Sequence, residues 1–181
     1  MARFLNPLAS LLPWRRKAPH AAEIYGAIVA RTRLPVFYQG FGVPDTLEGR
    51  FVVLSIHLFA VLHRLKAGGA QAIPMAQELA DHFTADMETV LREIGVGDLK
   101  IPKKVRGLAA TGAALLQDYE DAITKGDEAL AAIIAGALPL DETSAGAVAA
   151  RLAPYLRKTV RHLEAQSLQD VLAGRLSFPD P

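Results

Sequence analysis

The stretch that decides the fold is residues 33–66, RLPVFYQGFGVPDTLEGRFVVLSIHLFAVLHRLK. Its second half is almost continuously apolar, because only Ser55 and His57 interrupt the hydrophobic residues from position 51 to position 62. A helix that is apolar nearly all round belongs in a protein core. The uncharged run is about a dozen residues, shorter than the roughly 20 that a membrane span needs. The pattern therefore predicts a buried central helix.

Local signals mark where this central helix begins. Pro44 disfavours a helical conformation at the residue before it, and Asp45 can accept hydrogen bonds from the first free backbone amides. Glu48 lies three residues later, where its side chain can reach back to the Asp45 amide. We therefore expect Asp45 to be the N-cap of a helix that runs from about residue 46 to residue 66.

The segment before this cap is rich in aromatic residues and glycine. The tripeptide Gly40-Phe41-Gly42 offers two positions that can adopt a positive φ, which makes a compact turn. Such a turn would hold Phe37, Tyr38 and Phe41 in a rigid loop, suited to tight packing or to recognition. These three aromatic residues are candidate partner-binding residues.

Length and composition indicate the fold class. The chain has 181 residues, of which 51% are hydrophobic and only 7% aromatic. One domain with a substantial core fits this length, and the abundance of alanine and leucine favours helices. We expect an all-α fold, a single-domain helical bundle of about six helices around the central apolar helix. The chain has no cysteine, which excludes disulfides and thiolate chemistry and fits a cytoplasmic protein.

Periodic apolar residues predict the other helices at about residues 20–33, 71–94, 102–124, 126–138 and 141–173. Pro35 should stop the first of them. Pro154 should kink or divide the last one, because proline removes a helical hydrogen bond. We expect the helical domain to cover residues 20–176 and the tail at 177–181 to be frayed.

The N-terminal 19 residues form a basic and apolar tail with no acidic residue. Leucines and Trp14 precede a cluster of Arg15, Arg16 and Lys17, which resembles a short anchor for an anionic membrane surface. The prolines at positions 7 and 13 favour the alternative, a loosely docked tail. Both interpretations stay open at this stage.

Charge is balanced overall, with 20 lysines and arginines against 19 acidic residues. The chain therefore lacks the global positive field expected of a nucleic-acid-binding protein. One local cluster stands out, since Lys103, Lys104 and Arg106 open a helix where the macrodipole favours acids. An outside partner is one explanation. The other is that these side chains are solvated or paired with Asp98.

Two other arginines are candidates for a structural role. Arg50 and Arg64 lie at the two ends of the central helix, where a guanidinium can bind loop carbonyls or carboxylates with two hydrogen bonds. We interpret both as structural clamps, for example to Asp45, Asp86 or Asp98.

The chain shows no pattern of catalytic or metal-binding residues. Its histidines form no i, i+4 pair, and phosphate-binding and serine-hydrolase motifs are absent. Glu78, His82 and Asp86 share a helix face, but such spacing is typical of a solvated stripe. His57 is expected to be a buried histidine with a hydrogen-bond partner. We expect no enzyme activity, no metal and no cofactor.

Two blocks of residues resemble a known family. The first block contains Arg33, Pro35, Phe37, Tyr38, Gly42-Val43-Pro44-Asp45-Thr46, Gly49-Arg50-Phe51, His57, Arg64 and Leu65. The second contains Phe83, Asp86, Met87, Leu91-Arg92-Glu93, Gly95-Val96-Gly97-Asp98 and Pro102-Lys103-Lys104-Val105. In this order and spacing they resemble the ubiquinol-cytochrome c chaperone family, whose mitochondrial members are the Cbp3-type assembly factors of the cytochrome bc1 complex. The similarity covers about residues 20–125.

The resemblance implies a non-enzymatic helical assembly factor that binds newly made cytochrome b, or another bc1 subunit, near the inner membrane. It also implies a small helper protein as a partner. The chain departs from the family pattern at Thr111-Gly112-Ala113, where an aromatic and arginine-bearing stretch is expected. Two other functions stay open: a small-molecule carrier that uses His57 in a ligand pocket, and a peripheral membrane module without a specific client.

Overall fold

The computed structural model describes residues 18–181, which form an all-α bundle. The helices are α1 (Ala21–Thr32), α2 (Pro35–Gln39), α3 (Leu47–Lys66), α4 (Ile73–Glu93), α5 (Ile101–Ala122), α6 (Asp127–Ala137), α7 (Glu142–Glu164) and α8 (Leu168–Leu172), with a 3-10 turn at Gly69–Ala72. The expected membrane anchor in the first 17 residues lies outside the described part. None of the helices described is both long and apolar enough to cross a bilayer.

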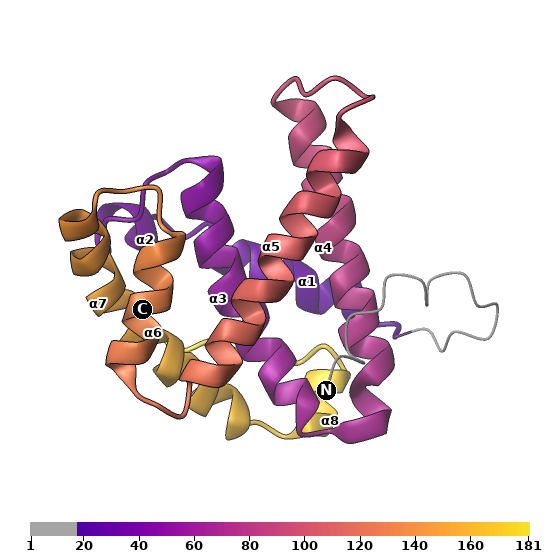
Figure 1. Cartoon of the computed structure of the whole chain (residues 1–181). Coiled ribbons are helices and arrows are strands. Elements are labelled where there is room, and N and C mark those ends of the chain that lie inside the picture. The colour runs from indigo at the N-terminus through magenta and orange to yellow at the C-terminus, as the bar shows by residue number, and fades with distance from the viewer. Residues whose placement is uncertain (1–17) are drawn as a thin grey trace.

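The central helix α3 packs against α1, α4, α5 and α7 (Figure 1). Every residue from position 51 to position 61 of α3 is buried, which confirms the prediction from the apolar run. Helix α6 covers α7 and contacts α5 on the other side. One large core joins these helices, as expected for a single-domain bundle around α3.

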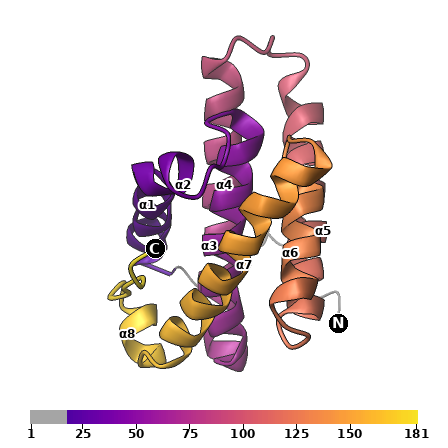
Figure 2. The same ribbon diagram turned by 90° about the vertical axis from the view of Figure 1, so that its left-hand side faces the viewer.

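The hairpin of α4 and α5 extends beyond the rest of the bundle, and its connecting loop lies at the far end in both views (Figures 1 and 2). At this end of the hairpin, Leu91, Ile101 and Val105 form a small cluster that is separate from the main core. The hairpin tip is therefore held together by its own residues.

The structure corrects the start of α3. The N-cap is Thr46, not Asp45, and its hydroxyl accepts a hydrogen bond from the Gly49 amide at 3.2 Å. Asp45 instead receives a hydrogen bond from Arg50 Nε at 2.5 Å. Gly49 packs closely on the preceding loop, since a Cβ at this glycine would collide with the Pro44 carbonyl oxygen.

Two short helices were missed in the sequence. Pro35 does separate two elements, but it also opens α2, because the fixed φ of proline suits the first turn of a helix. The expected long last helix ends at Glu164, and α8 follows after a break. Arg64 stabilises this break by donating two hydrogen bonds, at 2.9 and 3.3 Å, to the carbonyl of Gln166.

Pro154 does not divide α7, which continues through it. Pro154 and Ala150 both lie on the exposed side of the helix, so water can bind the carbonyl that loses its amide partner. Their buried neighbours Ala153 and Tyr155 hold the helix in the core. Packing on one side thus compensates for the missing hydrogen bond on the other.

The C-terminal tail, which we expected to be frayed, packs on the bundle. Arg31 donates a hydrogen bond to the Pro179 carbonyl, and Lys158 donates one to the Asp180 carbonyl at 2.8 Å. The ring centre of Phe178 lies 5.3 Å from the ring centre of His57. The last residues therefore close one side of the core.

Candidate functional site

Helix α2 points its aromatic residues in two directions. Phe37 is 0% exposed and lies 5.3 Å from both His57 and Tyr155, ring centre to ring centre. Phe41 is half-buried and packs on Phe37 at 5.6 Å. Of the two roles left open for this segment, Phe37 has the packing role, since it is part of the core. Of the glycines before the central helix, only Gly42 has a positive φ.

Tyr38 points away from this core toward α1 and α3. Its hydroxyl donates a hydrogen bond to the Thr32 carbonyl at 2.7 Å, and the Arg50 guanidinium lies 5.4 Å from the ring centre. Burial raises the pKa of the Tyr38 phenol, and nearby Asp45 acts in the same direction, although Arg50 opposes them. Tyr38 is therefore a neutral, fixed ring with one exposed edge.

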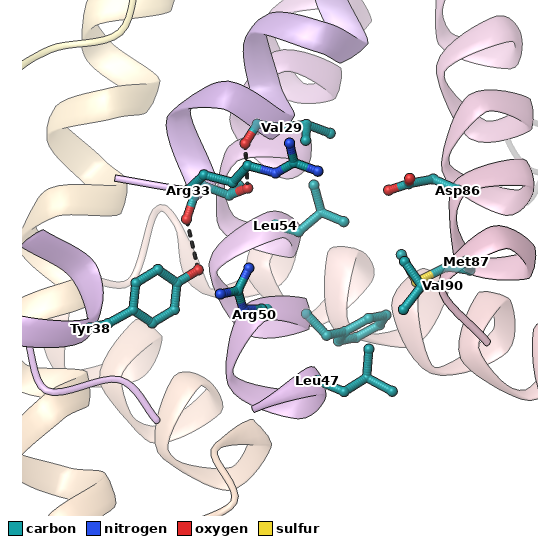
Figure 3. Close-up of a pocket in the computed structure, with 11 residues that line it drawn as sticks. Val29, Arg33, Tyr38, Leu47, Arg50, Leu54, Asp86, Met87 and Val90 are labelled. Carbon is teal, nitrogen blue, oxygen red and sulfur yellow. Dashed lines mark hydrogen bonds between the residues drawn. The ribbon is translucent and has the colours of Figure 1, made fainter. Parts of the chain in front are cut away.

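A pocket of about 110 Å³ opens beside Tyr38, between α1, α3 and α4 (Figure 3). Its lining is mainly apolar with charged groups at the sides: Val29, Thr32, Arg33, Tyr38, Leu47, Arg50, Phe51, Leu54, Asp86, Met87 and Val90. Buried residues such as Leu54 and Met87 form its floor. The pocket suits an apolar side chain better than a charged cofactor.

Charge is unevenly distributed around this pocket. Arg33 and Arg50 lie on the side of α1 and α3, whereas Asp86 lies across the opening on α4 (Figure 3). Asp86 accepts a hydrogen bond from the Tyr25 hydroxyl at 3.0 Å, and burial together with this carboxylate raises the Tyr25 pKa. Asp86 is thus held by the fold, while Arg33 is exposed and has no ion pair among residues 18–181.

The surroundings of His57 are closed. His57 is 0% exposed, and its Nδ1 donates to the Val53 carbonyl at 2.8 Å, so the neutral ring accepts at Nε2 from the Tyr155 hydroxyl, also at 2.8 Å. Arg31 Nε donates to the same hydroxyl at 3.3 Å. Burial lowers the pKa of His57 to about 4. His57 is a buried histidine with both nitrogens bonded, as expected.

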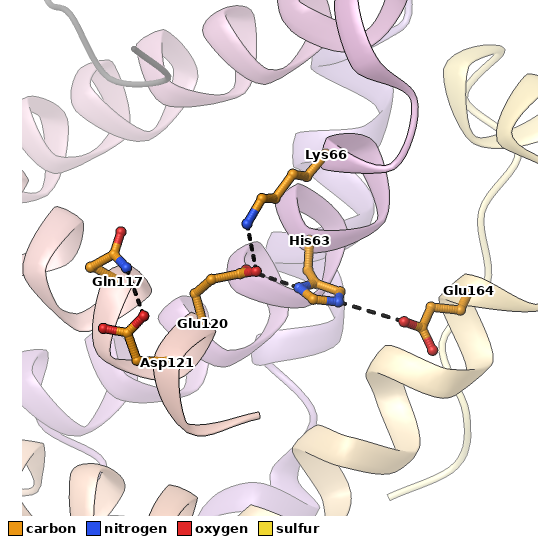
Figure 4. A network of polar contacts seen from close by, with 6 residues as sticks. All are labelled: His63, Lys66, Gln117, Glu120, Asp121 and Glu164. Carbon is orange, nitrogen blue, oxygen red and sulfur yellow. Dashed lines mark hydrogen bonds and ion pairs between the residues drawn. The ribbon is translucent and has the colours of Figure 1, made fainter. Parts of the chain in front are cut away.

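A second polar network joins α3, α5 and α7 (Figure 4). His63 lies between Glu120, at 2.9 Å, and Glu164, at 3.5 Å, and Lys66 binds Glu120 at 2.6 Å. Burial of Glu120 alone would raise its pKa, but the hydrogen bonds from Lys66 and His63 outweigh it and lower the pKa. The network cross-links three helices at the surface. No group of three or more potential metal ligands occurs among the described residues.

The candidate cations of α5 lie apart from the aromatic residues of α2. Lys103, Lys104 and Arg106 belong to the first turns of α5, at the tip of the α4 and α5 hairpin, whereas α2 lies beside α7 (Figure 1). Asp98 does not pair with them. Its carboxylate lies 3.6 Å from Arg92 Nε instead. The six candidate partner-binding residues therefore belong to two separate regions rather than to one surface.

Comparison with known proteins agrees with the helical architecture. The sequence profile described as "Ubiquinol-cytochrome C chaperone" matches residues 39–178. The chain belongs to the ubiquinol-cytochrome c chaperone family. The crystal structure of the Cbp3 homolog from Brucella abortus is 34% identical and superposes with a TM-score of 0.79, over 88% of each chain.

Curated relatives of this chaperone-family chain are more distant. Ubiquinol-cytochrome-c reductase complex assembly factor 1 of Xenopus laevis is 24% identical over 88% of this chain and 79% of its own length. The factor of Mus musculus is 24% identical over 93% of this chain, and that of Homo sapiens 23% over 97%. The match spans 57% of the mouse protein and 58% of the human one.

The pocket brings together residues from both blocks that carry the family resemblance. They are Arg33, Tyr38, Arg50, Phe51, Asp86 and Met87. Sequence reasoning missed the other apolar lining residues, such as Leu47 and Val90, because their periodicity was that of ordinary core positions. It considered Asp86 only within a polar stripe and as an arginine partner. The proximity of α1 to α4, which creates the pocket, leaves no signal in either segment alone.

Proposed function

We propose that this chain is an assembly factor of the cytochrome bc1 complex and that its client is newly made cytochrome b. The observation that carries the proposal is the family match over residues 39–178, together with relatives named assembly factors of the ubiquinol-cytochrome c reductase complex. A role without enzymatic catalysis agrees with the names of these proteins. We expect it to act at the cytoplasmic face of the inner membrane, where a small helper protein would be a further partner.

The pocket between α1, α3 and α4 is the best supported client-binding site. Its floor offers apolar contacts from Leu54 and Met87, which suit a side chain of an apolar client segment. Arg33 and Arg50 at the rim can bind carbonyls or carboxylates of the same segment. Tyr38 is held in place by its hydrogen bond to Thr32, so this wall is already formed before binding.

The small-molecule alternative loses its main support. It required a ligand pocket beside His57, and that side chain is 0% exposed with both ring nitrogens bonded. The pocket between α1, α3 and α4 is lined by neither His57 nor Tyr155. A peripheral membrane module without a client stays as the competing function. The following experiment distinguishes it from the assembly role.

The experiment deletes the gene in its source organism and measures assembled bc1 complex and haem b. We expect both to fall and to be restored by the intact gene. Arg33→Glu should restore them less well, because it reverses an exposed charge at the pocket rim. Lys125→Glu, an exposed charge reversal between α5 and α6, is the matched control. Unchanged bc1 and haem b levels after deletion would contradict the assembly role.

A crosslinking experiment tests the client and the site. A photoreactive amino acid replaces Val90 at the pocket, or Lys125 as the control, and the protein is activated in membranes of the source organism. We expect cytochrome b to be crosslinked from position 90 and much less from position 125. Equal yields from both positions would contradict the pocket as the binding site, and capture of another bc1 subunit would replace cytochrome b as the client.

A further inference from the structure

The loop between α4 and α5 exposes two large apolar side chains. Leu99 is 99% exposed and Ile94 is 58% exposed, more than the other two exposed large hydrophobic residues, Val36 and Ile73. Both lie at the end of the hairpin that extends beyond the bundle (Figure 2). Neither is needed to complete the small cluster at this end, which is formed by Leu91, Ile101 and Val105. These side chains are available to a partner.

The tip has a fixed shape. Gly95 adopts a φ of 82°, which ends α4, and the Val96 amide donates to the Leu91 carbonyl at 3.0 Å. The Lys100 amide closes a second turn by donating to the Gly97 carbonyl at 2.8 Å. Leu99 is therefore presented by an ordered turn, so that binding through it would cost little conformational entropy.

Cations are close to these apolar residues in the sequence. Residues 92–106 contain five cations and two carboxylates. Arg92 is paired with Glu88 at 2.8 Å and approaches Asp98 at 3.6 Å. The other four cations have no ion pair or side-chain hydrogen bond among residues 18–181, namely Lys100, Lys103, Lys104 and Arg106. The fold gains nothing from their charge, because α5 has no acid in its first turn and no side-chain cap.

The four free charges lie along one short segment. From Lys100 to Arg106 the chain advances six residues, and a rise of about 1.5 Å per residue makes this roughly 9 Å along the axis of α5. The Debye length at physiological salt is about 8 Å. A flat anionic surface that touches the tip would therefore attract Lys100, Lys103 and Lys104 most strongly and Arg106 less.

We propose that the tip of the α4 and α5 hairpin binds an anionic lipid bilayer, with Leu99 and Ile94 entering the headgroup region and the four cations near the phosphates. Exposed apolar residues together with nearby lysine and arginine are the combination that interfacial binding requires. The two carboxylates of this segment, Glu93 and Asp98, are outnumbered by its five cations, so that the tip keeps a positive charge toward an anionic surface. The proposal does not depend on the identity of the client, because binding through the tip requires only a lipid bilayer.

Fluorescence of a labelled tip tests the insertion directly. The chain has no cysteine, so Leu99→Cys in the full chain gives one site for an environment-sensitive NBD dye. Vesicles of phosphatidylcholine with 30% phosphatidylglycerol should shift the emission to the blue, and pure phosphatidylcholine should do so much less. The same dye at Lys125→Cys, at the other end of α5, should not shift. No shift at position 99 with anionic vesicles would overturn the proposal.

Vesicle binding by unlabelled protein separates the tip from the N-terminal residues. Replacing both Lys103 and Lys104 by Glu should weaken binding by at least tenfold, because each cation near such a surface contributes about a fivefold factor. Leu99→Ser should weaken it severalfold, whereas Ile73→Ser, at the opposite end of α4, should not. Binding that is unchanged in all tip variants would place the membrane contact elsewhere and overturn the proposal. Vesicles contain no cytochrome b, so these results do not depend on the assembly role.

Discussion

Helices α3 and α5 are similar in length, with 20 and 22 residues, but they are built for different purposes. Helix α3 begins with a Thr46 cap and Glu48 in its first turn, and its middle is buried on every side. Helix α5 begins with no side-chain cap, no acid and two lysines, beside a fully exposed leucine. In α3, the cap, the acid of the first turn and the buried residues all stabilise the helix itself. The second carries residues that the fold does not use, and this difference is the basis of our proposal that the tip contacts a partner.

A matched pair of leucine truncations is the strongest test of this contrast between α3 and the start of α5. Leu58→Ala in α3 should lower the free energy of unfolding by about 2–5 kcal/mol, because the side chain is 5% exposed and leaves a cavity. Leu99→Ala should change it by less than about 0.5 kcal/mol, as for other surface substitutions. Equilibrium urea denaturation measures both. A large loss at Leu99 would show that the tip supports the fold.

The interior of α3 should also give the bundle a pH dependence. The folded protein keeps His57 neutral down to pH about 4, whereas the imidazole of the unfolded chain binds a proton below about pH 6.5. The unfolded state therefore binds more protons between these values, and stability falls as the pH drops from 6.5 to 4, by about 3 kcal/mol in total. Denaturation from pH 7 to pH 4 should show this slope.

The control for that slope is His57→Gln, which removes the titrating group and keeps a polar side chain. The variant should be less stable at pH 7, because the bonds to Tyr155 and Val53 are disturbed. Its stability should nevertheless fall less between pH 6.5 and pH 4 than that of the parent protein. The other histidines are present in both proteins, so equal slopes would mean that His57 does not resist protonation.

The close packing at the start of α3 can be tested by replacing glycines with alanine. Gly49→Ala should destabilise the protein by about 1–3 kcal/mol, because the new methyl group would collide with the Pro44 carbonyl oxygen. Gly107→Ala, in the exposed part of α5, has no atom within 4 Å of the new Cβ and should stabilise by about 0.5–1 kcal/mol. The two changes are chemically identical. Effects of the same sign would contradict the close packing at the start of α3.

The same contrast explains how far the sequence could be interpreted. The run around Ile56 and Leu58 predicted the buried helix because burial on all sides leaves an unmistakable apolar pattern. The cap was misplaced by one residue because Asp45 and Thr46 are both good caps; in the structure Thr46 caps the helix and Asp45 binds Arg50 instead. The tail at 178–179 looked frayed because its contacts, to Arg31 and His57, come from residues more than a hundred positions away.

The two candidate partner regions differ in the same way. The cations Lys103 and Lys104 could be recognised from the sequence, since their position at a helix start is locally unfavourable. The pocket could not, because Val29, Leu54 and Val90 come from three helices and each looks like an ordinary core residue. Phe37 was placed in a loop suited to packing or recognition, because a helix of five residues between glycine and proline signals has the pattern of a loop.

The smallest expected effect tests the α5 side of the comparison. Lys103→Glu places an acid in the first turn of α5, where it favours the helix dipole, and should raise the free energy of unfolding by about 0.3–1 kcal/mol. The same change should weaken binding to anionic vesicles, so that stability and membrane affinity move in opposite directions. Ala110→Glu adds an acid to the exposed middle of the same helix and should not stabilise it. If Lys103→Glu destabilised the protein, the lysine would have a structural partner, and the claim that the fold does not use this charge would fail.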